Sequence, residues 1–145
     1  GDIIGALMGY IPKSIRQHVL ERSRGLCEYC QSAQKIIISL EIDHIIPVSL
    51  DGKTHLDNLC SACQGCNKHK KDFIEGLDPQ TQTTHRLFNP RQDNWHTHFR
   101  WDATGTIIIG LTAIGRATIE KLQMNRQDMV ASREVWVASG WHPPK

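Results

Sequence analysis

Residues 41–72 read EIDHIIPVSLDGKTHLDNLCSACQGCNKHKKD, and this stretch decides the fold. It combines an Asp-His pair, two asparagines, three cysteines and a cluster of lysines in one short segment. A hydrophobic core does not need this combination, whereas paired cysteines and hard oxygen ligands are typical of metal sites. The stretch therefore predicts a metal-bound unit that carries chemistry of its own.

The chain has five cysteines, and four of them form two Cys-x-x-Cys pairs, Cys27 with Cys30 and Cys63 with Cys66. An odd number of cysteines in close pairs argues against a disulfide framework. Four thiolates suit a closed, tetrahedral, structural zinc site. Cys60 extends the second pair with the same spacing and is expected in the core. An iron–sulfur site and buried free thiols are the alternatives to zinc.

Two candidate oxygen ligands lie on either side of the second cysteine run. Asp43 lies in a strand-like stretch that ends at Pro47, and Asn67 lies in the first turn of a helix expected to begin near Cys66. If the helix packs across the strand, a carboxylate and an amide oxygen converge, a ligand set that suits Mg²⁺ or Mn²⁺. Next to Asp43, a neutral His44 is a suitable general base for water at pH 7.

These residues, with the upstream CEYC, resemble the zinc-bound branch of the HNH endonuclease family in its HNN form. The resemblance covers residues 27–72 and implies a ββα-metal (His-Me finger) core. It implies that Asp43 and Asn67 hold the catalytic metal and that His44 is the base. It also implies that Asn58, the second residue of the catalytic set, holds the loop through backbone hydrogen bonds.

Some features fall outside that pattern. Cys60 is additional, and His55 and His69 are close enough in sequence to join a metal site or contact phosphate. Residues 85–130 are similar to an extension found on some bacterial HNH proteins, to which the resemblance assigns no role.

We expect an α+β fold with two parts: a nuclease core with zinc knuckles over residues 1–76, and a C-terminal extension over residues 77–145 packed on the core. The helices are expected over residues 11–24, 66–76, 112–124 and 128–138, a strand over 35–46, loops over 76–94, and a hairpin with arms at 99–101 and 107–109. The four tryptophans are expected to anchor the core of the extension, and three histidines to be surface or packing residues (Trp95, Trp101, Trp136 and Trp141; His85, His96 and His98).

The net charge of +2 permits a nucleic-acid partner but does not require one. Charge is concentrated beside the cysteines, where Lys68, Lys70 and Lys71 are expected to contact nucleic-acid phosphates. No apolar run approaches the ~20 residues that span a bilayer, so we expect a cytoplasmic protein without a membrane partner.

The function that fits best is a Mg²⁺- or Mn²⁺-dependent endonuclease that nicks or cleaves DNA, with structural zinc. RNA stays open as a substrate, and cleavage of both strands would call for a homodimer or a second event. The alternative is a zinc-bound nucleic-acid binding module without catalysis, which does not need the Asp43 and Asn67 pair. A protein-interaction domain that uses its tryptophans as a surface is a weaker alternative.

Overall fold

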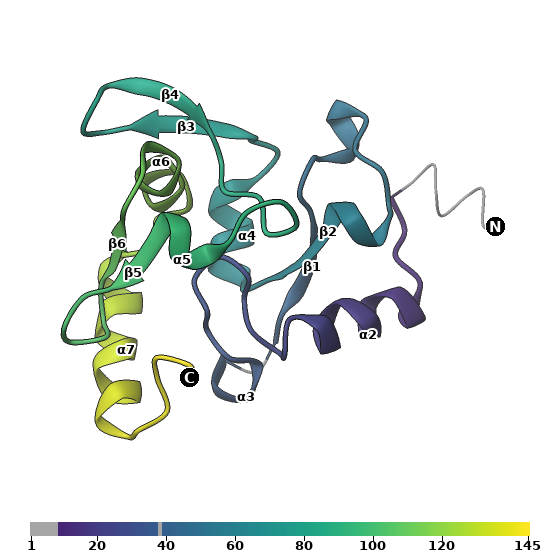
Figure 1. The fold of residues 1–145 in the computed structure, drawn as a ribbon. Coiled ribbons are helices and arrows are strands. Elements are labelled where there is room, and N and C mark those ends of the chain that lie inside the picture. The colour runs from purple at the N-terminus through teal and green to yellow at the C-terminus, as the bar shows by residue number, and fades with distance from the viewer. Residues whose placement is uncertain (1–8, 38) are drawn as a thin grey trace.

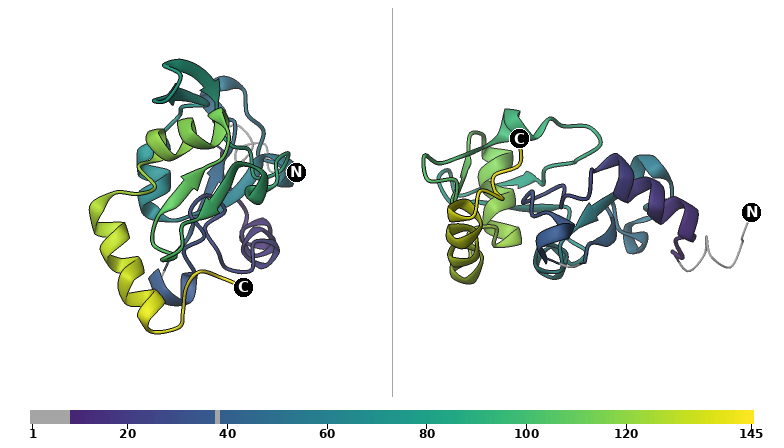
Figure 2. Two further views of the ribbon diagram at one scale, coloured as in Figure 1. Left: turned by 60° about the vertical axis from the view of Figure 1, so that its left-hand side comes forward. Right: turned by 90° about the horizontal axis from the view of Figure 1, so that it is seen from below.

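The computed structural model describes residues 9–37 and 39–145 (Figure 1). Residues 1–8 of the expected core and Ile38 of the expected strand lie outside the described residues. A small ββα unit lies at one end of the molecule, and the C-terminal hairpin and helices lie at the other (Figures 1 and 2). Helix α4 (Gln64–Lys70) is the helix of the ββα unit and also contacts a helix of the C-terminal part.

The ββα unit is the part that the quoted stretch predicts. Strand β1 (Glu41–His44) pairs antiparallel with β2 (Leu59–Ala62), with Asp43 opposite Cys60, and α4 follows. All four residues of β2 are buried, so this strand lies in the core of the unit. The α+β fold with a ββα core is therefore confirmed.

Helix α2 (Lys13–Arg22) packs on β2, within the range predicted for the first helix. Its last residue, Arg22, donates hydrogen bonds to the backbone oxygens of Leu56 and Leu59 at 2.9 and 2.7 Å. These bonds fix the end of the long loop between β1 and β2 against the helix.

Two predictions about the middle of the chain are wrong. Residues 34–37 form a short helix, α3 (Gln34–Ile37), so the strand is confined to Glu41–His44. Helix α4 ends at Lys70, where Lys71 adopts a positive φ of 51°, and does not reach Gly76.

The predicted loop at residues 76–94 begins instead with a hairpin, in which β3 (Glu75–Asp78) pairs with β4 (Thr83–Arg86). The predicted boundary between residues 76 and 77 thus falls inside a strand. Gly76 was interpreted as a helix stop, but its role is packing: a Cβ here would lie 3.2 Å from the carbonyl oxygen of Ala117 in the next layer.

The C-terminal part follows the sequence prediction closely. Its elements are α5 (Trp95–His98), β5 (Phe99–Trp101), β6 (Ile108–Gly110), α6 (Ala113–Leu122) and α7 (Gln127–Ala138). Strands β5 and β6 pair antiparallel. The Thr112 side chain caps α6 by accepting a hydrogen bond from the backbone N–H of Gly115 at 3.0 Å.

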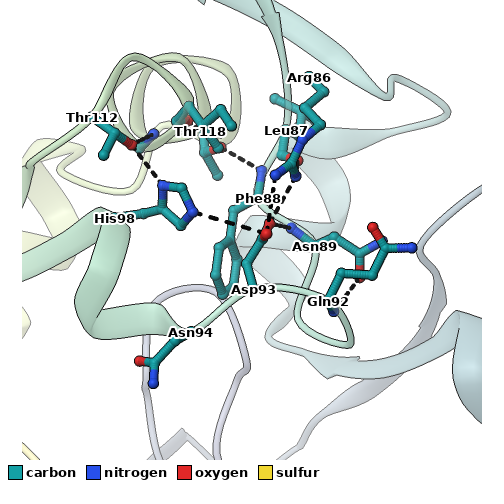
Figure 3. A network of polar contacts seen from close by, with 12 residues as sticks. Arg86, Leu87, Phe88, Asn89, Gln92, Asp93, Asn94, His98, Thr112 and Thr118 are labelled. Carbon is teal, nitrogen blue, oxygen red and sulfur yellow. Dashed lines mark hydrogen bonds and ion pairs between the residues drawn. The ribbon is translucent and has the colours of Figure 1, made fainter.

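A network of polar contacts holds the segment between β4 and α5 on helix α6 (Figure 3). Asp93 accepts two hydrogen bonds from the Arg86 guanidinium, at 2.7 and 3.0 Å, and one from the backbone N–H of Asn89. The His98 ring lies between Asp93 and Thr112, with its Nδ1 atom 2.6 Å from the Thr112 hydroxyl. His98 is thus a packing residue, as expected.

One hydrophobic core runs through both parts of the molecule and includes the four paired cysteines. Trp95 and Trp136 belong to it, and Trp101 packs against it. The prediction is wrong for Trp141, whose side chain is 57% exposed. No helix in the described part of the chain is long and apolar enough to cross a membrane.

Candidate active site

The four paired cysteines form one buried cluster. Their sulfur atoms all lie within 4.8 Å of one another, although the pairs are separated by the whole β1–β2 unit. The Sγ atoms of Cys30 and Cys63 are 3.6 Å apart. Zn–S bonds of ~2.3 Å in a tetrahedron place sulfurs about 3.8 Å apart, so the donor set fits a zinc ion.

Each pair has the hydrogen bond expected of a metal-binding knuckle. The backbone N–H of Cys30 donates to Cys27 Sγ, and that of Cys66 donates to Cys63 Sγ, both at 3.4 Å. Hydrogen bonding to Cys27 also holds the pKa of Cys30 well below its ordinary value, which favours a thiolate there. The second pair opens helix α4, so metal binding would fix the start of the helix that carries Asn67.

Asp43 lies on the face of β1 that meets α4. Its Oδ2 atom is 3.1 Å from the Lys70 ammonium and accepts a hydrogen bond from the Tyr29 hydroxyl at 3.3 Å. Its other oxygen, Oδ1, makes no hydrogen bond within the described residues. Burial raises the pKa of Asp43, and the Lys70 charge opposes this.

Asn67 meets the same strand one helical turn before Lys70. Its Nδ2 atom donates to Glu41 Oε2 at 2.5 Å, so the amide group has a fixed orientation and its Oδ1 atom is left to act as a ligand. Glu41 and Asp43 lie two residues apart on β1 and therefore share a face. Asn67 and Lys70 share a face of α4 because they are three residues apart. The structure thus brings Asp43 and Asn67 to one strand–helix interface.

His44 ends β1, directly after Asp43. Its Nε2 atom lies 2.9 Å from the Thr54 hydroxyl, which fixes the ring and leaves Nδ1 as the second nitrogen. Burial lowers the pKa of His44 below its ordinary value of 6.5, so the ring is neutral at pH 7. Asp43 and His44 both line a surface cavity of about 320 Å³, together with Asp72.

Asn58 closes the loop that follows His44. Its Oδ1 accepts from the backbone N–H of Ile46 at 2.9 Å, and its Nδ2 donates to the backbone oxygens of Ile46 and Lys53 at 2.9 and 2.8 Å. These bonds join the start of the loop to its end, next to Thr54. Asn58 supports the ring position of His44 from a distance and does not contact it.

A comparison with known protein families matches the part of the chain that carries this site. The model of the HNH endonuclease family matches residues 27–73. These residues form an HNH domain. The type IV methyl-directed restriction enzyme EcoKMcrA of Escherichia coli (strain K12) is 30% identical over 74 residues. That match covers 43% of this chain and only 27% of the relative's length. No solved structure gives a significant match.

The expected lysine contacts need a correction in this HNH domain. Lys68 and Lys71 are exposed, but Lys70 is only 1% exposed and pairs with Asp43. Its position follows from the helix period: three residues after Asn67, the side chain returns to the face that covers β1. Lys70 therefore does not lie on the solvent-exposed face with the other two lysines.

The additional residues do not join the cysteine cluster. Cys60 is buried in β2, and its thiol lies 3.6 Å from the Tyr29 hydroxyl. His55 is exposed, and the His69 Nδ1 atom lies 2.8 Å from the backbone oxygen of Gly65 within α4. Of the described residues, only the four paired cysteines form a metal-binding group of three or more Cys, His, Asp or Glu side chains.

Sequence reasoning missed three residues that contact an expected site residue, Glu41, Tyr29 and Thr54. It named Lys70 but gave it a phosphate contact in place of the ion pair with Asp43. The alternation along β1 was a usable signal for Glu41, because Glu41 is two residues before Asp43. The helix period was a usable signal for Lys70. Thr54 and Tyr29 are placed by loop and knuckle packing, and no local pattern indicates them.

Proposed function

We propose that this chain is a metal-dependent endonuclease that hydrolyses phosphodiester bonds in DNA. The observation that carries the proposal is the joint placement of Asp43, Asn67 and His44. Two oxygen ligands share one strand–helix interface. The His44 ring lines the same cavity as one of them, Asp43. A binding module has no need of this arrangement.

The residues divide the chemistry between them. Asp43 Oδ1 and Asn67 Oδ1 are suited to hold Mg²⁺ or Mn²⁺, since both are hard oxygen donors. The bound metal supplies a Lewis acid that stabilises negative charge in the transition state. His44 Nδ1 takes a proton from a water molecule as the water oxygen attacks phosphorus and the bond to the leaving oxygen breaks. Lys70 keeps Asp43 ionised in its buried position.

The cysteine cluster is proposed to hold structural zinc. Four thiolates leave no open coordination position for a substrate, so the metal there would serve folding and not catalysis. Zinc would join Cys27 and Cys30, which precede the ββα unit, to the start of the helix that carries Asn67.

A plasmid-cleavage assay tests the proposal. The zinc-loaded chain is incubated with supercoiled plasmid and Mg²⁺, with Mn²⁺, or with no added divalent metal. The relative is named a methyl-directed restriction enzyme, so plasmids with and without base methylation are compared. We expect nicked or linear product only with added Mg²⁺ or Mn²⁺. Linear product formed at once would support a homodimer, and nicked product would support action on one strand.

The same assay addresses the alternative function. A chain that binds plasmid DNA but leaves both plasmids intact with every metal would be the zinc-bound binding module. DNA binding is measured separately, without Mg²⁺ or Mn²⁺, so that binding and turnover are distinguished.

Replacing Thr54 by valine is expected to lower the cleavage rate about tenfold without changing the fold, an effect of the size seen when partners of functional histidines are removed. The hydroxyl holds the His44 ring in place through Nε2, and valine keeps its shape but removes the hydrogen bond. Single-turnover cleavage with saturating Mg²⁺ measures the effect. Thr54→Ser is the matched control and should cleave at nearly the wild-type rate; equal losses in both variants would contradict the role.

Replacing Lys68 and Lys71 together by glutamine is expected to weaken DNA binding uniformly across sequences. If each lysine contacts one phosphate, the slope of log affinity against log salt concentration should fall by about two. Fluorescence anisotropy with a labelled duplex over a salt series measures the slope. Lys13→Gln with Lys35→Gln removes the same charge from α2 and α3 and should leave the slope unchanged.

A further inference from the structure

Arg133 in helix α7 is the largest fully buried side chain of the described residues. It is 0% exposed, and no carboxylate of the described residues forms an ion pair with it. A guanidinium stays charged at any ordinary pH, and burying a charge without a counter-charge costs several kcal/mol. The fold therefore needs a negative charge near Arg133, and the hydrogen-bond acceptors of Arg133 do not supply one.

The hydrogen bonds of Arg133 satisfy only part of the group. Nη1 donates to the backbone oxygen of Thr106 at 3.0 Å and to Asn125 Oδ1 at 3.2 Å, and Nη2 donates to the backbone oxygen of Met124 at 2.6 Å. All three acceptors are neutral. The Nε atom is buried and has no hydrogen-bond partner among the described residues. Both the charge and one N–H thus remain uncompensated by ordinary protein groups.

The packing of Arg133 leads toward the first cysteine pair. Burial lowers the pKa of Arg133, and the sulfurs of Cys30 and Cys66 oppose this. The guanidinium also lies over the ring of Trp101, 5.2 Å from the ring centre, and Trp101 Nε1 donates to Gln31 Oε1 at 2.8 Å. Gln31 directly follows Cys30, so the extension packs against the first knuckle at this point.

A zinc ion bound by four thiolates is a negatively charged centre, because four thiolate charges outweigh one divalent cation. In the core, where the effective dielectric constant is low, this negative centre and a lone guanidinium are each unfavourable alone. When they lie close together, the charge of the guanidinium and the charge of the zinc–thiolate centre compensate each other. N–H donors beside thiolate ligands also reduce the electron density that sulfur gives to the metal.

We propose that Arg133 is the counter-charge of the zinc–thiolate centre and that the C-terminal extension completes this centre by supplying it. The inference rests on the zinc site proposed above and gives the extension a role. Arg133 acts through the cysteine ligands and does not coordinate the metal.

The test compares Arg133→Lys with Arg133→Gln in the full zinc-loaded chain. Both changes remove the guanidinium fork, but only glutamine removes the charge. Zinc affinity is measured by competition with a chromophoric chelator. We expect glutamine to weaken zinc binding by about tenfold or more, the size of outer-shell effects, and lysine to stay close to the wild type. Arg100→Gln, an exposed arginine in the same part of the chain, is the control and should not change the affinity.

Cobalt substitution supplies a readout that a purely structural role would not change. Loss of the neighbouring positive charge should move the sulfur-to-cobalt charge-transfer bands of Arg133→Gln to longer wavelength, with the tetrahedral d–d bands retained. Equal zinc affinities and equal spectra for the lysine and glutamine variants would overturn the proposal.

Two further outcomes are distinguishable. If the wild type binds no zinc, the zinc-site proposal itself fails, and this inference fails with it. If Arg133→Gln is unfolded as isolated, saturating zinc is added. Recovery of the fold supports an effect through zinc binding, whereas no recovery shows that the fold needs Arg133 directly and overturns the proposal.

Discussion

Replacing His44 by alanine is expected to lower metal-dependent cleavage by about 10²- to 10⁴-fold, the usual contribution of a general base. The ring lines the cavity beside Asp43, and Thr54 contacts its Nε2 atom, so Nδ1 is the atom proposed to take the proton. Alanine removes that nitrogen and leaves the candidate metal ligands Asp43 and Asn67 in place. Single-turnover cleavage of plasmid by zinc-loaded protein with saturating Mg²⁺ or Mn²⁺ measures the loss.

Controls separate this loss from unfolding. His44 is half-buried at the end of β1, so the variant should keep its zinc content and nearly its melting temperature. His55→Ala removes an exposed imidazole from the loop between β1 and β2, and this variant should cleave at the wild-type rate. An H44A variant that cleaves as fast as the wild type would refute the assignment of His44 as base. An inactive H55A variant would instead point to a general effect on the loop.

How far the site could be predicted depends on the range of the interactions that build it. The two cysteine pairs were predictable, because a Cys-x-x-Cys turn is local and a tetrahedral centre needs two of them. The Thr112 cap was predictable for the same reason: the hydroxyl and the N–H it binds are three residues apart.

The contacts of Asp43 and Asn67 were not predictable in detail, because they depend on how far α4 is rotated about its axis against β1. That rotation turns Lys70 inward to Asp43 and leaves Lys68 and Lys71 exposed. Sequence alone favoured the common position of a lysine, on the solvent-exposed face. The buried position is stable because an ion pair compensates the cost of burial.

In the middle of the chain, predictions based on local sequence signals were wrong because tertiary contacts decide the structure there. Gly76 looks like the end of a helix, but it lies in β3, where α6 packs so closely that a Cβ would be 3.2 Å from the carbonyl oxygen of Ala117. The isoleucines at 36 and 37 favour a strand by propensity. They instead lie in α3, directly after the first cysteine pair, where tertiary contacts override that weak preference.

The other large effect is expected from replacing Cys63 by serine. This residue caps α4 and supplies one sulfur of the cluster, with its Sγ atom 3.6 Å from that of Cys30. Structural zinc contributes an apparent ~10–16 kcal/mol to small zinc domains, comparable to or larger than the whole stability of a typical domain. Losing one of four ligands should therefore remove zinc and leave residues 27–73 largely unfolded.

Cys60→Ser is a closely matched control for that change. Cys60 is three residues earlier, is equally buried and is absent from the cluster. The same substitution there should keep the zinc and cost only on the order of 1–3 kcal/mol, the cost of placing a hydroxyl in a buried site. Zinc content by metal analysis and thermal unfolding by circular dichroism measure both variants. If the wild type and C63S both contain no zinc and C63S melts at the same temperature as C60S, the four cysteines are a packed thiol cluster and no metal stabilises the HNH domain.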